Sequence, residues 1–394
     1  MFEALPEQPK DKILHLAQMF REDPRTDKID LGVGVYRDAD GRTPIMRAIK
    51  SAEKTLWDTE TTKAYTGLAG TPEFNDAMVG LILGGAVPRE AVASAATPGG
   101  TGAVRLGFEL ARLANSGVTV WHSQPTWPNH PAILRHLDMP VRTYRYFDSQ
   151  TGTVDTAGMQ EDLTGAKTGD VVLLHGCCHN PTGANLSAAD WQAIIAMLND
   201  RGLLPMIDIA YQGFGDGLSA DAEATRAVVS GCPEAIIAAS CSKNFGVYKE
   251  RTGILIATSH STETCALRQS NLAALNRLTY SFAPDHGARL VTMVLTDDDL
   301  RADWEAELED VRTGMLALRT QLSDALRQET NSDRFDFVGS HRGMFSQLGI
   351  TTDEVAALRE RHGIYIIGDS RMNVAGLNSA TVPTLARAVA DVIG

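Results

Sequence analysis

The sequence of 394 residues has only five cysteines, and no two of them form a CxxC pair. An odd number of cysteines without that spacing does not suit a disulfide framework, so we expect reduced thiols in a cytoplasmic protein. We predict no metal centre. The chain also lacks the roughly 18 consecutive apolar residues of a membrane span. Its first 20 residues do not have the pattern of a signal peptide, so we expect neither membrane insertion nor export.

Basic residues are also in deficit, with 36 Lys and Arg against 49 Asp and Glu and a net charge of -13. A general affinity for nucleic acid or an anionic membrane would have to overcome this field, so we expect small-molecule partners instead. The composition, 43% hydrophobic and 22% charged, is that of an ordinary globular protein. At roughly 150 residues per domain, the length allows two to three domains.

Short apolar runs alternate with helical patterns in the first two thirds of the chain. The runs lie at 118–121, 171–175, 204–208, 235–239 and 254–257. Such alternation predicts an α/β fold with a mostly parallel, doubly wound sheet that helices cover on both faces.

A different pattern begins after Thr296. Apolar residues then recur in steps of three and four, which predicts one amphipathic helix of about 30 residues. Beyond it we expect strands at 335–338, 344–348 and 364–367 and helices at 352–362 and 382–392, which together indicate a smaller α+β domain. We therefore divide the chain into an N-terminal arm with part of the smaller domain (1–35), a large α/β domain (36–300) and the smaller domain (301–394).

Lys243 directly follows one of the predicted strands, so it lies at the carboxyl edge of the sheet, where such folds bind ligands. A desolvated lysine there can form a Schiff base. A lysine in a loop is more often only solvated, but Ser240 and Arg251 lie close to this one in the sequence. A hydroxyl and a guanidinium beside a reactive lysine suit the binding of a phosphorylated aldehyde.

A glycine-rich turn containing Gly100, Thr101 and Gly102 opens a helical pattern, and free N–H groups at a helix start can bind phosphate. The dinucleotide fingerprint fails because Arg105 occupies the third glycine position, and the chain has no P-loop. The turn therefore indicates either a phosphate on something other than NAD or ATP, or no ligand at all.

Polar residues follow two more of the predicted strands. Asp208 ends a buried strand and precedes Tyr211, while Asn180 lies in an Asn-Pro-Thr-Gly turn. An acidic residue at such a place is usually a cap or an ion-pair partner, but it can also hold a proton on a pyridine nitrogen. Asn-Pro-Thr-Gly is most often only turn chemistry.

Taken together, these segments resemble the fold-type I, pyridoxal-phosphate-dependent aminotransferases of the aspartate and aromatic amino acid group. The resemblance covers almost the whole chain. Its motifs lie at 31–44, 63–70, 97–103, 123–130, 179–183, 208–214, 242–246, 276–281 and 370–376.

The resemblance implies a role for each residue of a pyridoxal 5′-phosphate site. Lys243 would bind the cofactor covalently and act as the catalytic base, with Asp208 and Tyr211 as further catalytic residues. Asp208 would pair with the pyridinium nitrogen, Asn180 and Tyr211 with the ring hydroxyl, and Trp127 would stack on the ring. The phosphate would be held by Gly100, Thr101, Ser240, Arg251 and, from a neighbouring subunit, Tyr65.

Two arginines resemble the substrate clamps of this family. Arg371 would bind the α-carboxylate, in a pocket that Gly34, Trp127 and Asn180 also line. Arg277 would reach across a homodimer to a distal carboxylate. The resemblance thus implies a homodimer with shared active sites, and a ping-pong transfer of the amino group to 2-oxoglutarate.

The chain departs from many aspartate-type relatives at Ala64 and Phe282, where those relatives have asparagines. A less polar rim favours an enzyme that accepts aromatic as well as dicarboxylic amino acids. Three alternatives remain: a strict aspartate aminotransferase, a decarboxylase or β-lyase that uses the same cofactor, and a non-catalytic regulator. The two carboxylate clamps argue for transamination. A regulator would need a DNA-reading module, which we do not find before the resemblance begins near residue 20.

Overall fold

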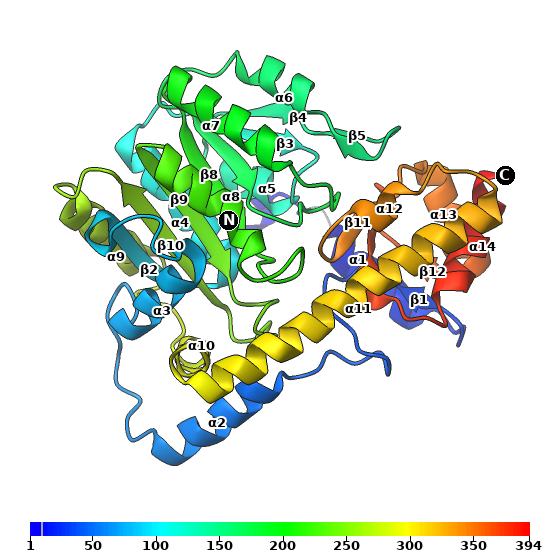
Figure 1. Cartoon of the computed structure of the whole chain (residues 1–394), viewed down its shortest axis with the longest axis horizontal. Helices are drawn as coiled ribbons and strands as arrows, with labels where there is room; N and C mark the ends of the chain where they lie inside the picture. The colour runs from blue at the N-terminus through cyan, green and yellow to red at the C-terminus, as the bar shows by residue number, and fades with distance from the viewer. Residues whose placement is uncertain (9–10) are drawn as a thin grey trace.

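The computed structural model describes residues 1–8 and 11–394 (Figure 1). Its centre is a seven-stranded sheet in the order β2-β10-β9-β8-β7-β3-β4. The strands span Val92–Pro98 (β2), Val120–Gln124 (β3), Val141–Arg145 (β4), Val171–His175 (β7), Leu204–Ile209 (β8), Glu234–Ser240 (β9) and Thr252–Ser259 (β10). Strands β9, β8, β7, β3 and β4 pair in parallel, whereas β10 is antiparallel to both of its neighbours. The predicted mostly parallel sheet is confirmed.

Helices cover both faces of this sheet, which is why its central strands are apolar on both sides. Along β9, Ile236 and Ala238 belong to one apolar cluster, and Ile237 and Ala239 belong to the other. The first cluster is covered by α4 (Gly99–Ala114), α5 (Asn129–His136) and α9 (Cys265–Thr279). The second is covered by α2 (Arg47–Thr59), α3 (Pro72–Leu83), α6 (Thr156–Leu163), α7 (Ala188–Arg201), α8 (Ala220–Gly231) and α10 (His286–Thr296).

Helix α11 (Asp298–Thr330) is the predicted long helix, and it is 33 residues long. It begins at Asp297, whose side chain accepts hydrogen bonds from two backbone N–H groups of the first turn. Trp304 and Leu308 near its start pack against the sheet, whereas Leu322 and Leu326 near its end belong to a separate apolar cluster. The helix therefore connects the two parts of the molecule (Figure 1).

The second part of the molecule combines both ends of the chain around that separate cluster. Strand β1 (Ile29–Asp30) pairs with β12 (Ile364–Tyr365), and β11 (Phe345–Gln347) pairs with β13 (Arg371–Asn373). The surrounding helices are α1 (Lys12–Glu22), α12 (Phe337–Ser340), α13 (Thr352–His362) and α14 (Val382–Ile393), and a short hairpin joins β5 (Phe147–Asp148) to β6 (Thr153–Val154). The division of the chain at residues 35 and 300 stays a prediction.

The strand predicted at 335–338 is wrong. Residues 335–338 instead form a turn leading into α12, closed by a hydrogen bond from Val338 N to Phe335 O at 3.0 Å. Phe335 and Val338 are both buried in the same cluster. A spacing of three residues places two side chains on one side of a helical turn. Phe335 and Val338 can therefore both face the core from a helical turn, and a strand is not needed to bury them.

The cysteines and the apolar helices bear on the expectations about disulfides and membrane insertion. All five cysteines are free, and four of them are buried. Among the described residues, no helix is both long and apolar enough to span a membrane.

Candidate active site

The carboxyl ends of β8 and β9 bring the two central residues of the predicted site to the same sheet edge. Asp208 lies near the end of β8, and Lys243 lies in the turn that follows β9. The charges are close enough to interact, since Asp208 favours the protonated form of Lys243. This pairing follows directly from the parallel register of the two strands.

Asp208 is held by a buried histidine that sequence reasoning missed. His130 Nε2 lies 3.1 Å from Asp208 Oδ2. Burial raises the pKa of Asp208, but the hydrogen bond from His130 and the nearby positive charge outweigh it, so the pKa is below its usual value. The carboxyl group of Asp208 is thus kept as an anion although it is buried.

The histidine is itself oriented by further side chains. Thr126 Oγ1 lies 2.8 Å from His130 Nδ1 and 3.2 Å from His175 Nε2. Burial lowers the pKa of His175 to about 3, so this imidazole is neutral. The rings of Trp127 and His130 meet edge to face with centroids 5.1 Å apart. The 123–130 motif contains Thr126, Trp127 and His130, but nothing in the sequence itself connects this motif to Asp208.

Lys243 is a partly desolvated amine. Burial lowers its pKa to about 8, although the charge of Asp208 opposes this and that of Arg251 adds to it. Its Nζ lies 5.0 Å from the centroid of the Tyr211 ring. Burial also raises the pKa of Tyr211, which therefore stays a protonated phenol. At pH 7 roughly a tenth of Lys243 is the free amine, which is the nucleophilic form.

The turn that carries Lys243 is held in place by contacts with helix α11. Trp304 of α11 donates a hydrogen bond to the carbonyl of Asn244 at 2.7 Å. The rings of Phe245 and Trp304 are stacked with centroids 4.4 Å apart. The first turns of α11 therefore hold the backbone on the C-terminal side of Lys243.

The glycine-rich turn forms the N-terminus of α4, as predicted. A Cβ at Gly100 would lie 2.9 Å from Ser240 Cβ, and a Cβ at Gly99 would lie 2.4 Å from Arg251 Nη2. The absence of side chains there lets the free N–H groups of the helix, the Ser240 hydroxyl and the Arg251 guanidinium approach one another. A cavity of about 330 Å³ adjoins this point and is lined by Thr101 and Arg251 among others. Such an arrangement suits a phosphate group.

Asn180 lies in the loop that follows β7 and is buried. Its backbone N–H donates to His175 Nδ1 at 3.4 Å. Among the described residues, its buried Oδ1 has no hydrogen-bond partner. Because buried polar atoms are normally paired, this oxygen is available to a bound group.

Arg371 comes from β13, in the second part of the molecule, and is buried. Its Nη2 donates to the carbonyl of Gly32 at 2.8 Å, and its guanidinium lies 4.5 Å from the centroid of the Phe345 ring. Burial lowers its pKa. Within the described part of the chain its Nε has no partner and no carboxylate pairs with it. Gly34 faces the same ring, since a Cβ there would lie 2.7 Å from Phe345 Cζ.

Tyr65 and Arg277 lie apart from this group, on the surface of the chain. The side chain of Tyr65 is 88% exposed and meets the ring of Phe282 at a centroid distance of 5.3 Å. Arg277, near the end of α9, is also exposed and donates a hydrogen bond from Nη1 to Ser281 Oγ at 2.7 Å. The structure thus brings most of the predicted site residues together at the sheet edge, but it leaves Tyr65 and Arg277 at the surface of the chain.

Comparisons with known proteins agree in naming one family. The family model for aminotransferase class I and II matches residues 26–389. The aromatic-amino-acid aminotransferase of Paracoccus denitrificans is 58% identical, over 98% of both chains. The aspartate aminotransferase of Escherichia coli K12 is 40% identical over the full length of both. The crystal structure of the Burkholderia pseudomallei aromatic-amino-acid aminotransferase covalently bound to pyridoxal phosphate is 37% identical, covers 100% of both chains and has a TM-score of 0.97.

Proposed function

The chain belongs to the class I and II aminotransferases and is an aminotransferase that uses pyridoxal 5′-phosphate, and we propose that it accepts both aromatic and dicarboxylic L-amino acids, with 2-oxoglutarate as amino acceptor. The relatives named for aromatic and for aspartate substrates support the two halves of this proposal. The observation that carries it is the apolar contact between Tyr65 and Phe282, the residue that immediately follows in sequence the Ser281 that the exposed Arg277 binds.

The residues at the sheet edge fit this cofactor. The N-terminus of α4 with Ser240 and Arg251 suits its phosphate, and the unpartnered amide of Asn180 suits a polar group on its ring. The anionic Asp208 suits a protonated ring nitrogen. Each residue therefore offers the charge or hydrogen bond that a different part of the cofactor needs.

We assign the remaining predicted residues to the same cofactor site. Lys243 would bind the cofactor covalently, Tyr211 would donate to the ring hydroxyl, and Trp127 would cover the ring face. Gly100 and Thr101 would contribute backbone N–H groups to the phosphate. When bound, the cofactor withdraws electrons from the α-carbon of the amino acid and carries the amino group between the two half-reactions.

The protein's own contribution to the reaction is proton transfer and orientation. Lys243, with a pKa near 8, can accept a proton at neutral pH and return it, as a general base should. His130 keeps Asp208 ionised and fixes its direction. Arg371 holds the substrate α-carboxylate in a bidentate fork, so one bond to the α-carbon is set in the position for cleavage.

Tyr65 and Arg277 support a homodimer in which each chain completes the site of the other. Both side chains are exposed in the single chain, although each resembles a residue that contacts phosphate or substrate in this family. A cytoplasmic location is supported by the five free thiols.

The rim around Arg277 supports the acceptance of two substrate classes. A distal carboxylate would pair with the guanidinium. An aromatic side chain cannot pair with it, and a dry, unpaired charge would cost several kcal/mol, so the arginine must turn towards water. Arg277 makes a hydrogen bond only to Ser281 among the described side chains, and Phe282, the next residue in the chain after Ser281, adds apolar surface against Tyr65. Both features favour such a movement.

A substrate screen tests this proposal. With 2-oxoglutarate as acceptor, we compare kcat/KM for aspartate, phenylalanine, tyrosine and tryptophan. Values for aspartate and phenylalanine within about tenfold of each other support dual specificity, because tenfold corresponds to about 1.4 kcal/mol in transition-state binding. A thousandfold preference for aspartate, about 4 kcal/mol, would instead identify a strict aspartate aminotransferase.

A further inference from the structure

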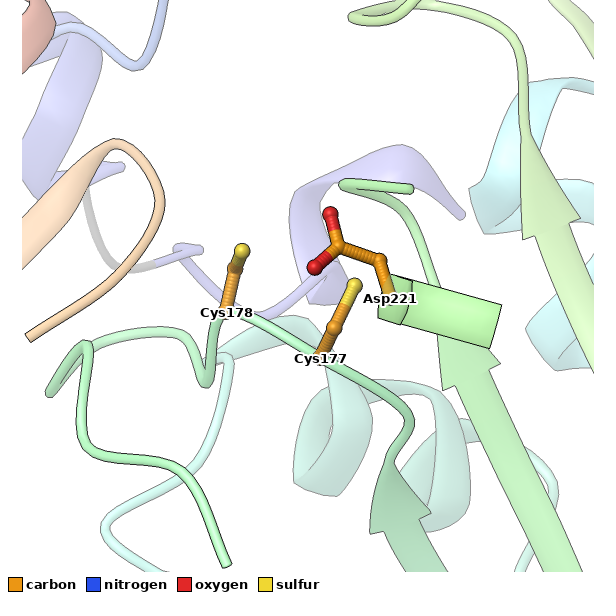
Figure 2. A group of neighbouring side chains, drawn as sticks. All are labelled: Cys177, Cys178 and Asp221. Carbon is orange, nitrogen blue, oxygen red and sulfur yellow. The ribbon is translucent and has the colours of Figure 1, made fainter. Parts of the chain in front are cut away.

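A second cluster of reactive side chains lies behind the sheet edge, outside the cofactor site. Cys177 and Cys178 follow strand β7, and Asp221 comes from the first turn of α8. Each offers one ligand atom, and the two sulfurs and the carboxylate oxygen lie within 4.8 Å of one another. Figure 2 shows the Asp221 carboxylate pointing from the opposite side towards the two thiols. All three residues are buried.

The carboxylate of Asp221 is held in place by backbone groups. Its Oδ2 accepts hydrogen bonds from Gly213 N and Gly215 N, and its Oδ1 accepts one from Asp216 N, each at 2.8 Å. A carboxylate oxygen can accept two hydrogen bonds, so Oδ1 keeps a free lone pair. A Cβ at Gly215 would lie 2.5 Å from this Oδ1 and 3.1 Å from Cys178 Sγ. The glycine therefore leaves open the space between the two ligand atoms.

The cluster borders a cavity of about 290 Å³. The buried residues Cys177 and Asp221 line this cavity. The exposed residues Asp216 and Glu223 line it as well. Asp216 is paired with Arg342, whereas Glu223 forms no ion pair with the described residues. A cation therefore has a route past acidic side chains to the Cys177 thiol and the Asp221 carboxylate, and the cavity has room for water on the ion's open side.

A buried positive charge lies next to the cluster. Arg319 is fully buried and donates to backbone carbonyls, including that of Gly343, and to Ser346 Oγ. In the described part of the chain no carboxylate pairs with Arg319. A Cβ at Gly343 would lie 2.4 Å from Cys178 Cβ, which shows how closely the arginine-binding loop approaches the thiol. Buried charges are usually paired, and a buried guanidinium without a carboxylate partner is therefore unusual. A negatively charged group at the cluster would supply the missing counter-charge.

We propose that Cys177, Cys178 and Asp221 bind a thiophilic divalent cation, with Zn²⁺ as the preferred class and a water from the cavity as fourth ligand. Two sulfurs, one carboxylate oxygen and one water give the tetrahedral ligand set that zinc prefers. On binding, both thiols release their protons to solvent and the sulfurs form bonds to the ion. Two thiolates, one carboxylate and a dication carry a net charge of -1, which Arg319 neutralises.

This proposal revises the expectation from the sequence that the chain has no metal centre. Adjacent cysteines do not have the usual spacing of zinc ligands, and the third ligand lies more than 40 residues away, so only the fold brings the set together. The hydrogen bond to Cys178 and burial raise the pKa of Cys177. The hydrogen bond to Cys177 lowers the pKa of Cys178, but burial together with the negative charges of Asp221 and Asp216 outweighs it, so the pKa of Cys178 is also raised. Both thiols are therefore protonated before an ion binds.

In the experiment, the purified enzyme with its cofactor bound is titrated with Cd²⁺. The ultraviolet charge-transfer band of sulfur–cadmium bonds is followed during the titration. We expect a band that saturates at about one ion per chain and that Zn²⁺ removes by competition. Cys265→Ser is the matched control, because Cys265 is partly exposed and lies outside the cluster. It should leave the band unchanged, whereas Cys177→Ser should weaken ion binding at least about tenfold.

Two results would overturn the proposal: a wild-type protein without a saturable band, or a band that survives in both Cys177→Ser and Cys178→Ser. Cadmium NMR of the wild-type holoenzyme covers the case in which a variant does not fold. A chemical shift typical of two sulfur ligands supports the site, and a shift typical of oxygen ligands alone contradicts it. These readouts do not depend on amino transfer, so failure here leaves the proposed substrates untouched.

Discussion

The sheet edge around Lys243 and the surface around Arg277 are built in contrasting ways. At the edge, Asp208, Asn180 and Arg371 are buried, and His130 already holds Asp208 in position. At the surface, Tyr65 and Arg277 are exposed; Tyr65 contacts the Phe282 ring and Arg277 donates a hydrogen bond to Ser281. Cofactor chemistry needs fixed geometry, whereas acceptance of two substrate classes needs a group that can move. The difference supports the proposal that the buried edge fixes the chemistry and that the exposed rim, in the proposed homodimer, sets the substrate range.

The largest effect should come from removing the amine at the buried edge. We expect Lys243→Ala to reduce kcat by at least about 10⁴-fold, because both the covalent anchor and the general base are lost. Mass spectrometry after borohydride reduction should find the added mass of the cofactor in the parent chain and not in the variant. Lys249→Ala, at an exposed lysine of the same loop, is the control and should behave as the parent. Near-parental activity in Lys243→Ala would remove the lysine from the mechanism.

The next largest effect concerns the buried clamp. We expect Arg371→Ala to lower kcat/KM by about 10²- to 10³-fold for aspartate and phenylalanine alike, since every substrate carries the α-carboxylate and removing one partner of a buried charge pair costs about 2–5 kcal/mol. Steady-state kinetics with both amino acids measure the loss, and Arg387→Ala, at an exposed arginine of α14, serves as control. A loss confined to one substrate class would contradict this assignment.

The exposed arginine should instead act selectively. We expect Arg277→Ala to lower kcat/KM for aspartate by about 100-fold, about 2.7 kcal/mol, and for phenylalanine by less than about threefold. The ratio of the two values is the measurement. Arg277→Lys should restore only part of the aspartate activity, because an ammonium cannot form the bidentate pair. Equal losses for both substrates would mean that Arg277 supports the pocket in general and does not select substrates.

The smallest effect is the pH dependence of cofactor capture by the cofactor-free enzyme. Burial lowers the pKa of Lys243 to about 8, and only the neutral amine attacks an aldehyde. The capture rate should therefore rise about tenfold per pH unit below pH 7 and level off above about pH 9. Stopped-flow absorbance after addition of pyridoxal 5′-phosphate follows this rate. A rate that keeps rising to pH 10 would show an ordinary, solvated lysine.

Much of the fold could be predicted because its signals are local. The apolar runs of the sheet and the steps of three and four in α11 are properties of short segments, and both predictions are confirmed. The strand prediction at 335–338 is wrong for the same reason, because a short run with a few apolar residues is compatible with a helical turn as well as with a strand. The reversed direction of β10 depends on how it pairs with β2 and β9, which no single segment encodes.

The site was predicted through its motifs and not through its contacts. Lys243 and Asp208 each follow a parallel strand, so their meeting at one edge could be inferred from the fold class. The role of His130 could not, because its contact with Asp208 spans 78 residues and depends on the direction of α5. The roles of Tyr65 and Arg277 stay predictions, since they depend on a second chain.

The length of α11 sets a limit on how this chain can change in evolution. One end of the helix holds the loop of Lys243 through Trp304, and the other end packs into the cluster next to the strand that carries Arg371. Inserting a single residue between Met315 and Leu322 would turn everything beyond it by about 100° and shift it by about 1.5 Å. Substitutions on the exposed side of α11 should therefore be tolerated freely, whereas single-residue insertions and deletions in this stretch should be incompatible with an active enzyme.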